Sequence, residues 1–162
     1  MSYAPPGFES KIVDPARLAN AIASLPRPLV FTNGCFDILH RGHVTYLAQA
    51  RALGASLVVA ANSDASVRRL GKGDDRPVKP LADRMVLLAA LECVSMVTWF
   101  DEGTPIERIL DCRPEVLAKG GDWPVEKIVG YREVLGWGGG VHSIPFIHAR
   151  STTALLEKIR RL

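Results

Sequence analysis

The chain has 162 residues, of which 48% are hydrophobic and 23% are charged, and its formal net charge is +3. This length suits one domain with a substantial core, and the composition is that of an ordinary globular protein. The mildly basic balance, without a run of like charges, argues against a nucleic-acid-binding arm and favours a small, phosphate-rich substrate. No stretch approaches the roughly 20 apolar residues of a membrane span, and no signal peptide is expected.

The three cysteines lie far apart, at positions 35, 93 and 112. Their spacing matches neither a disulfide framework nor a zinc site, which predicts a cytoplasmic protein in a reducing environment. Cys35 lies inside the motif described below, where a small filler side chain is favoured over a catalytic thiol.

The first residues, 1–10, are polar and proline-rich and are expected to be loosely ordered. Asp14 and Pro15 combine an N-cap with a first-turn proline and predict a helix that ends at about Ser24. We therefore divide the chain into an N-terminal segment and helix, residues 1–28, and a single domain, residues 29–162.

From residue 29 onward, apolar runs alternate with helical patterns. Strands are expected at 29–32, 56–61, 96–100, 115–118 and 141–144. Helices are expected at 44–53, just after 64, at 81–91, from a capping box at 104–107 to about 110, and from 151 to about 161. This alternation predicts a Rossmann-like, doubly wound parallel sheet of about five strands with helices on both faces.

In such sheets ligands bind beyond the carboxyl ends of the strands. The most informative motif, His40-Arg41-Gly42-His43, falls at such an end, between the first strand and a helix. A helix N-terminus attracts anions, and Gly42 would leave room for a phosphate against the backbone. A zinc site is the alternative, but no His-Glu-x-x-His pattern is present. The motif therefore predicts a polyphosphate site.

The residues before the motif add further candidates. Thr32, Asn33 and Gly34 form a strong turn signal, and backbone N–H groups in such a turn can also bind phosphate oxygens. Asp37 has two open interpretations: it caps the following turn, or it helps to position a magnesium-bound triphosphate.

A basic loop follows the second strand and its short helix. The loop spans residues 71–77, and four cations lie in it or just after it: Lys72, Arg76, Lys79 and Arg84. A solvated charged loop is one interpretation. The other is that the loop closes over a polyphosphate and that Lys72 and Arg84 neutralise the leaving group.

Two more strand ends carry candidates. Lys119-Gly120-Gly121-Asp122 is either a simple turn or a place where a ribose or base lies against backbone, with Lys119, Gly121 and Asp122 nearby. Ser151 and Thr152 cap the last helix, whose N-terminal N–H groups can serve a phosphate as well.

The stretch from Phe31 to His43 resembles the signature of the HxGH nucleotidyltransferases of the cytidylyltransferase-like superfamily. More closely, the chain resembles the adenylyltransferase domain of D-glycero-β-D-manno-heptose 1-phosphate adenylyltransferases. The supporting stretches occur in the right order, at 58–64, 76–78, 119–122 and 151–153. The resemblance implies transfer of AMP from ATP to the heptose 1-phosphate, which gives ADP-heptose and pyrophosphate for lipopolysaccharide core synthesis.

The resemblance also implies roles for the residues. An ionised phosphate oxygen attacks the α-phosphorus in line and needs no general base, so positioning and charge stabilisation remain. His40 and His43 would donate hydrogen bonds to phosphate oxygens, and the amides of Gly34 and Phe36 would hold the triphosphate. Mg²⁺ is expected through the ATP phosphates, with no metal ligands from the protein.

The expected partners are ATP and a sugar 1-phosphate made by a separate heptose kinase, with no nucleic acid and no membrane. The apolar run 85–91 would serve a homo-oligomer or the core equally well. Two positions depart from the pattern. Lys79 stands where a neutral polar residue is expected, and Phe146 stands where glycerol-3-phosphate cytidylyltransferases carry an arginine. That sister activity and a non-catalytic nucleotide-binding scaffold stay open as alternatives.

Overall fold

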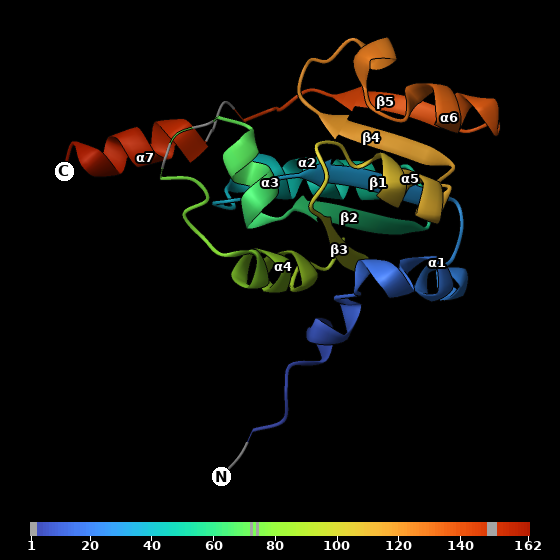
Figure 1. Ribbon diagram of the computed structural model, residues 1–162, viewed down its shortest axis with the longest axis horizontal. Helices are drawn as coiled ribbons and strands as arrows, with labels where there is room; N and C mark the ends of the chain where they lie inside the picture. Colours follow the sequence, from blue (N-terminus) through green and yellow to red (C-terminus); the bar gives the residue numbers. More distant parts are fainter. Residues whose placement is uncertain (1–2, 72, 74, 149–151) are drawn as a thin grey trace.

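The computed structural model describes residues 3–71, 73, 75–148 and 152–162. Its centre is a sheet of five parallel strands in the order β3-β2-β1-β4-β5 (Figure 1). The strands are β1 (Leu29–Gly34), β2 (Ser56–Asn62), β3 (Met96–Phe100), β4 (Val116–Gly120) and β5 (Gly140–Ile144). The predicted fold class is confirmed, and each predicted strand agrees with an observed one to within two residues at either end.

The chain order reverses beside β1. This strand pairs with β2 on one side, with Phe31 opposite Val58, and with β4 on the other, with Phe31 opposite Leu117. After β3 the chain crosses to β4, so the crevice between the carboxyl ends of β1 and β4 is the topological switch point. Open α/β sheets bind their ligands at this place.

Helices connect the strands. The α-helices are α1 (Leu18–Ala21), α2 (Arg41–Arg51), α3 (Asp64–Arg69), α4 (Leu81–Ala89), α5 (Ile106–Cys112), α6 (Tyr131–Gly136) and α7 (Thr152–Arg160). The 3₁₀ segments are η1 (Gly7–Lys11), η2 (Pro15–Arg17), η3 (Ile22–Ser24) and η4 (Val125–Lys127). Among the described residues, no helix is long and apolar enough to cross a membrane.

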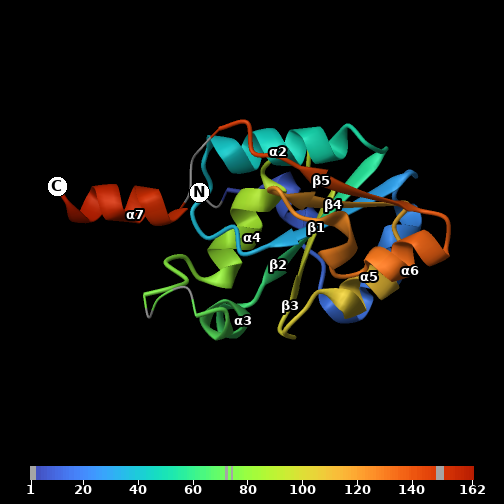
Figure 2. The ribbon, with the colours of Figure 1, turned by 90° about the horizontal axis from the view of Figure 1, so that it is seen from above.

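Helices cover both faces of the sheet, as Figure 2 shows from above, and each face has its own hydrophobic core. On the face covered by α1, α5 and α6, which we call the α5 face, Phe31 packs with Leu18 and Ile109. On the face covered by α2 and α4, the α2 face, Val30 packs with Leu47. Adjacent residues of one strand thus enter opposite cores, which explains why the strands are apolar throughout.

The N-terminal segment is more ordered than expected. Gly7–Lys11 forms η1, the Val13 amide donates to the carbonyl of Val97 at 2.8 Å, and Leu18 is fully buried in the α5-face core. β3 is an edge strand, so its outer backbone groups are available to the incoming chain. The expectation of loose order was wrong for residues 7–10.

Two helix predictions need correction, and one helix was missed. α2 begins at Arg41, three residues before the predicted start, so His40 is its N-cap. α5 follows Pro105 without a side-chain cap, so the expected capping box does not form. The short helix α6 was not predicted, because its glycine-rich surroundings resemble a loop.

Candidate active site

His40 and His43 lie together at the start of α2. His40 has an extended backbone (φ −140°, ψ 170°), and His43 lies in the first helical turn. The two rings stack, with centroids 3.8 Å apart and an angle of 20° between their planes. Among the described residues, no hydrogen-bond partner is available to the buried Nδ1 atom of either ring. Buried polar atoms are normally paired, so each of these nitrogens has room for a partner that a water molecule or a ligand would supply.

The surroundings favour neutral imidazoles in the absence of a ligand. Burial lowers the pKa of His40 below its usual value. Burial and the neighbouring charge of His40 lower the pKa of His43 to about 4, against an opposing backbone contact with Ile38. A polyanion would have the opposite effect, because negative charge favours the imidazolium form. The pair can therefore take up positive charge when a phosphate arrives.

The loop between β1 and α2 turns sharply beside this pair. Phe36 has a φ of 47°, a left-handed conformation that is uncommon for a bulky residue and is often found at ligand sites. Its ring folds back over Gly34, where a Cβ would lie 3.0 Å from the ring. The same ring meets His43 edge-on at 5.5 Å between centroids. Gly34 and Phe36 thus lie at the site, and phosphate binding by their amides stays a prediction.

The space beside Gly42 is filled by protein. Gly42 is buried, and a Cβ there would lie 3.1 Å from the His40 ring and 3.3 Å from the carbonyl oxygen of His148. Glycine therefore lets the segment after β5 cross the start of α2. The expected room for a phosphate is occupied by these groups in this structure.

A second helix N-terminus approaches the same loop. The Thr152 hydroxyl, at the start of α7, donates to the carbonyl of Ile38 at 3.5 Å. α7 then projects from the body of the molecule (Figures 1 and 2). Two predicted site residues, Ser151 and Lys72, lie outside the described residues.

Asp37 has a role that the sequence did not indicate. Its carboxylate is 1% exposed and accepts hydrogen bonds from the Arg76 side chain and from the backbone N–H groups of Val78 and Lys79. Burial alone would raise the pKa of Asp37, but these donors outweigh burial and hold the pKa below its usual value. The structure favours an anchor for the segment after the basic loop over either predicted role.

Arg84 is also engaged within the protein. Its guanidinium donates to the carbonyls of Cys35 at 2.6 Å and Lys79 at 3.1 Å, and it pairs with Asp64 at 2.7 Å. The side chain is fully buried, so in this state it does not reach a leaving group. Arg84 instead links three segments: the loop after β1 through Cys35, the start of α3 through Asp64, and the residues before α4 through Lys79.

The side chain of Thr32 does not face the site. Thr32 is fully buried, and its hydroxyl shares a hydrogen bond with the hydroxyl of Tyr46. Tyr46 also donates to the carbonyl of Ala118 at 3.2 Å. These bonds tie β1 to α2 and β4, and phosphate binding by the backbone N–H groups of this turn stays a prediction.

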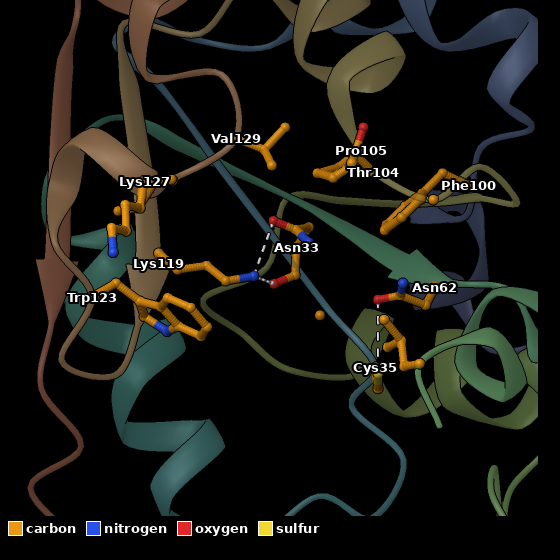
Figure 3. Close-up of a pocket in the computed structure, with 14 residues that line it drawn as sticks. Asn33, Cys35, Asn62, Phe100, Thr104, Pro105, Lys119, Trp123, Lys127 and Val129 are labelled. Atoms are coloured by element: carbon orange, nitrogen blue, oxygen red, sulfur yellow. Dashed lines mark hydrogen bonds between the residues drawn. The ribbon is translucent and has the colours of Figure 1, made fainter. Parts of the chain in front are cut away.

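A cavity of about 360 Å³ opens at the carboxyl ends of the strands (Figure 3). Asn33, Gly34 and Cys35 form one wall. The remaining lining residues come from β2, β3, β4 and the loops around them: Asn62, Leu70, Phe100, Gly103, Thr104, Pro105, Lys119, Trp123, Lys127, Ile128 and Val129. Cys35, which we interpreted as filler, therefore borders a cavity.

Lys119 and Asn33 join the two strands of the switch point. The Lys119 ammonium donates to the backbone and side-chain oxygens of Asn33, both at 3.3 Å, as Figure 3 shows. The cation thus stands at the cavity wall, beside the end of β1.

Aromatic rings cover the double glycine after β4. A Cβ on Gly120 would lie 2.8 Å from the Phe146 ring, and one on Gly121 would lie 3.1 Å from the Trp123 indole. The Ser143 hydroxyl donates to the carbonyl of Gly121 at 2.6 Å and ties this turn to β5. Asp122 is exposed in the same turn. The rings fill the space beside the two glycines in this structure, and contact of this turn with a base or ribose stays a prediction.

Mg²⁺ is expected to bind through the ATP phosphates, without metal ligands from the protein. Over the described part of the chain, no three His, Cys, Asp or Glu residues come together to hold a metal. Asp37, the carboxylate we had considered, is bonded to protein donors. Mg²⁺ often binds chiefly through substrate phosphates and water, so its expected place on ATP stays a prediction.

Sequence reasoning missed several lining residues of the cavity. Asn62 ends β2, Thr104 precedes α5, and Trp123 and Lys127 follow the double glycine. Of these, only Asn62 and Trp123 could have been found from the sequence, because each follows the carboxyl end of a predicted strand. The other two reach the cavity through loop geometry that no local pattern encodes.

A doubly wound parallel sheet, with an imidazole pair at a helix N-terminus near its switch point, defines a nucleotide- or phosphate-binding α/β protein. The chain belongs to the cytidylyltransferase-like family, whose model matches residues 31–150.

Similar proteins indicate a more specific group within this family. The chain is 60% identical to a D-beta-D-heptose 1-phosphate adenylyltransferase of Bordetella bronchiseptica, over 95% of this chain and 96% of that protein. It is 48% identical to the bifunctional protein HldE of Geotalea uraniireducens, over 99% of this chain but only 33% of that protein. Among solved structures, a lipopolysaccharide core biosynthesis protein of Thermoplasma volcanium matches with a TM-score of 0.60 and 26% identity, over 75% of this chain and 98% of that one.

Proposed function

We propose that this protein transfers AMP from ATP to D-glycero-β-D-manno-heptose 1-phosphate and releases pyrophosphate. The observation that carries the proposal is the stacked pair His40 and His43, whose buried Nδ1 atoms lack a protein partner among the described residues. The 60% identity to a heptose 1-phosphate adenylyltransferase supports the choice of nucleotide and acceptor.

The chemistry needs no general base. A phosphate oxygen of the acceptor is already ionised at neutral pH and attacks the α-phosphorus, while pyrophosphate leaves from the opposite side. Catalysis then depends on positioning and on stabilising charge in the transition state. His40 and His43 donate hydrogen bonds to phosphate oxygens as that charge develops.

The triphosphate lies, in this proposal, against the loop at Gly34 and Phe36 and between the starts of α2 and α7. Mg²⁺ enters with ATP and neutralises part of the phosphate charge. Lys72 compensates the departing pyrophosphate. Arg84 supports this step indirectly, because its guanidinium holds the Lys79 carbonyl beyond the basic loop.

The acceptor is itself a phosphate ester at an anomeric position, so a phosphorylating enzyme must make it first. We place both reactions in the cytoplasm, where ATP is available. The three cysteines of the chain are free thiols in the structure, which is compatible with a reducing compartment.

The test is pyrophosphate release with each of the four nucleoside triphosphates and a panel of sugar 1-phosphates and glycerol 3-phosphate. We expect ATP with the heptose β-1-phosphate to give the fastest release. Turnover of CTP with glycerol 3-phosphate, but not of ATP, would contradict the proposal. ATP binding without pyrophosphate release from any pair would favour a scaffold.

A further inference from the structure

We infer that the hydroxyl of Tyr46 is a positioning group for the reaction. By joining the carboxyl ends of β1 and β4, it fixes where α2 holds His43 relative to the turn after β4. The inference rests on the proposed function and assigns a role to a buried residue outside the expected substrate contacts.

The ladder between β1 and β4 is short. Within the described sheet, β1 pairs with β2 at six positions but with β4 at only two. The second of these two pairs joins Phe31 to Leu117, so the next positions along the strands are Thr32 and Ala118. The crevice of the switch point opens here. Beyond this pair, hydrogen bonds from side chains join the two strands.

Tyr46 makes the first of these connections. Its hydroxyl donates to the carbonyl of Ala118 at 3.2 Å and shares a hydrogen bond with the hydroxyl of Thr32. A phenol has a single hydroxyl proton, so Thr32 must be the donor in the second bond. Burial raises the pKa of Tyr46 well above its usual value, which keeps the phenol protonated at neutral pH. Tyr46 therefore bridges β1 and β4 at the first position after their ladder ends.

The same residue is part of the helix that carries the histidines. Tyr46 lies three residues after His43 on α2, so the two side chains are neighbours on the helix. The Phe146 ring meets Tyr46 edge-on at 5.7 Å between centroids and His43 at 6.5 Å. Other contacts of α2 with the sheet, such as Leu47 against Val30, are apolar and have no preferred direction. The hydrogen bonds of Tyr46 are directional, so they fix the rotation and depth of the helix.

This position matters because the proposed transition state spans the crevice. The phosphates lie at the start of α2, and the nucleoside is expected along the turn after β4. The spacing of these two places then decides whether His43 reaches the phosphate oxygens as charge develops. A displacement of about 1 Å at such a site can lower a rate by up to about 10².

Tyr46→Phe tests the inference, because it removes the hydroxyl and keeps the ring. We expect kcat to fall about tenfold, while the KM values for ATP and the sugar 1-phosphate change less than about twofold. Thr32→Val should lower kcat in the same way, and Thr32→Ser, which keeps a hydroxyl, should restore most of the loss. The combined variant Thr32→Val with Tyr46→Phe should be no slower than Tyr46→Phe, since both changes remove one shared bond.

Two controls separate positioning from a loss of stability. Tyr131→Phe removes a hydroxyl at the start of α6 and should leave kcat unchanged. Ile22→Val removes one methyl group from the α5-face core, so it should lower the urea midpoint about as much as Tyr46→Phe and still keep normal kcat. Normal kcat in Tyr46→Phe, or an equal fall of kcat in Ile22→Val, would overturn the inference. A higher KM for ATP with unchanged kcat would also overturn it.

Nuclear magnetic resonance of the imidazoles separates this inference from the proposed function. The His43 signal, identified by its absence from His43→Asn, should shift in Tyr46→Phe but not in Tyr131→Phe, without any substrate. If the protein releases no pyrophosphate but this shift appears, the proposed function fails and the positioning of His43 by Tyr46 stands. Turnover with an unmoved His43 signal and normal kcat in Tyr46→Phe would remove the inference alone.

Discussion

Asp37 forms a buried ion pair with Arg76, which lies 39 residues further along the chain. The Asp37 side chain, in the loop after β1, is 0% exposed, and the Arg76 side chain is 7% exposed. The same carboxylate accepts hydrogen bonds from the backbone of Val78 and Lys79. One buried group thus fixes the far end of the basic loop against the loop that carries the histidines.

Asp37→Asn should therefore destabilise the protein strongly. The Arg76 guanidinium would remain buried without its counter-charge, at a cost of about 3 kcal/mol in the free energy of unfolding. Urea denaturation measures this loss. Asp111→Asn breaks the Arg108–Asp111 pair, whose members are 15% and 33% exposed, and should cost less than about 1 kcal/mol. Equal losses in the two variants would contradict the anchoring role.

His43→Ala should lower kcat by roughly 10²–10³, because it removes one preorganised donor to the transition state. Circular dichroism should show an intact fold. His142→Ala is the matched control, since His142 is exposed on β5, and it should keep normal turnover. Near-normal kcat in His43→Ala would remove the histidine from the mechanism.

The titration of His43 predicts two pH effects. Its pKa is lowered to about 4 in the fold, from an ordinary 6.5, so the unfolded chain binds more protons between these values. The free energy of unfolding therefore contains a contribution from neutral His43, which is complete above pH 6.5 and is lost as pH falls toward 4. It amounts to about 1–2 kcal/mol after allowing for solvent screening. Thermal unfolding from pH 7 to 4.5 should show this slope, and it should be weaker in His43→Asn.

Bound ATP should raise the pKa of His43 again, because the negative charge of the phosphates favours the imidazolium form. Binding should then take up protons, and affinity should increase as pH falls from 7 toward 5. Calorimetry in buffers of different ionisation enthalpy measures the uptake. Proton release on binding would show that the triphosphate lies elsewhere.

Gly120→Ala should weaken ATP binding with little loss of stability. The new Cβ would lie 2.8 Å from the Phe146 ring, which is 43% exposed and can move away. We expect a several-fold higher KM for ATP if this surface holds the base. Gly136→Ala has no neighbour within 4 Å of its Cβ and should leave the KM unchanged. The same KM in both variants would place the base elsewhere.

The sequence predicted the sheet well because its strands are short apolar runs with buried faces. It also located the histidine pair, because strand, turn and helix signals are local. It did not predict that the side chains of Thr32, Asp37 and Arg84 form hydrogen bonds within the protein. The Asp37 partner is 39 residues away, and those of Arg84 at Cys35 and Asp64 are 49 and 20 residues away. Such pairings depend on the assembled fold.

The cavity was unpredictable for the same reason. Its lining combines the end of β1 with Thr104 before α5 and Lys127 in η4, segments that meet only when the sheet forms. The residue pattern within one segment does not show which other segments will lie beside it in the fold.

Labelled phosphorus distinguishes adenylyl transfer from phosphoryl transfer to the sugar. ATP labelled at the α-phosphorus is incubated with heptose 1-phosphate and Mg²⁺, in parallel with ATP labelled at the γ-phosphorus. With adenylyl transfer, the α label appears in ADP-heptose and the γ label in pyrophosphate, and His43→Ala should slow both equally. Appearance of the γ label in the sugar product would identify phosphoryl transfer and rule out adenylyl transfer.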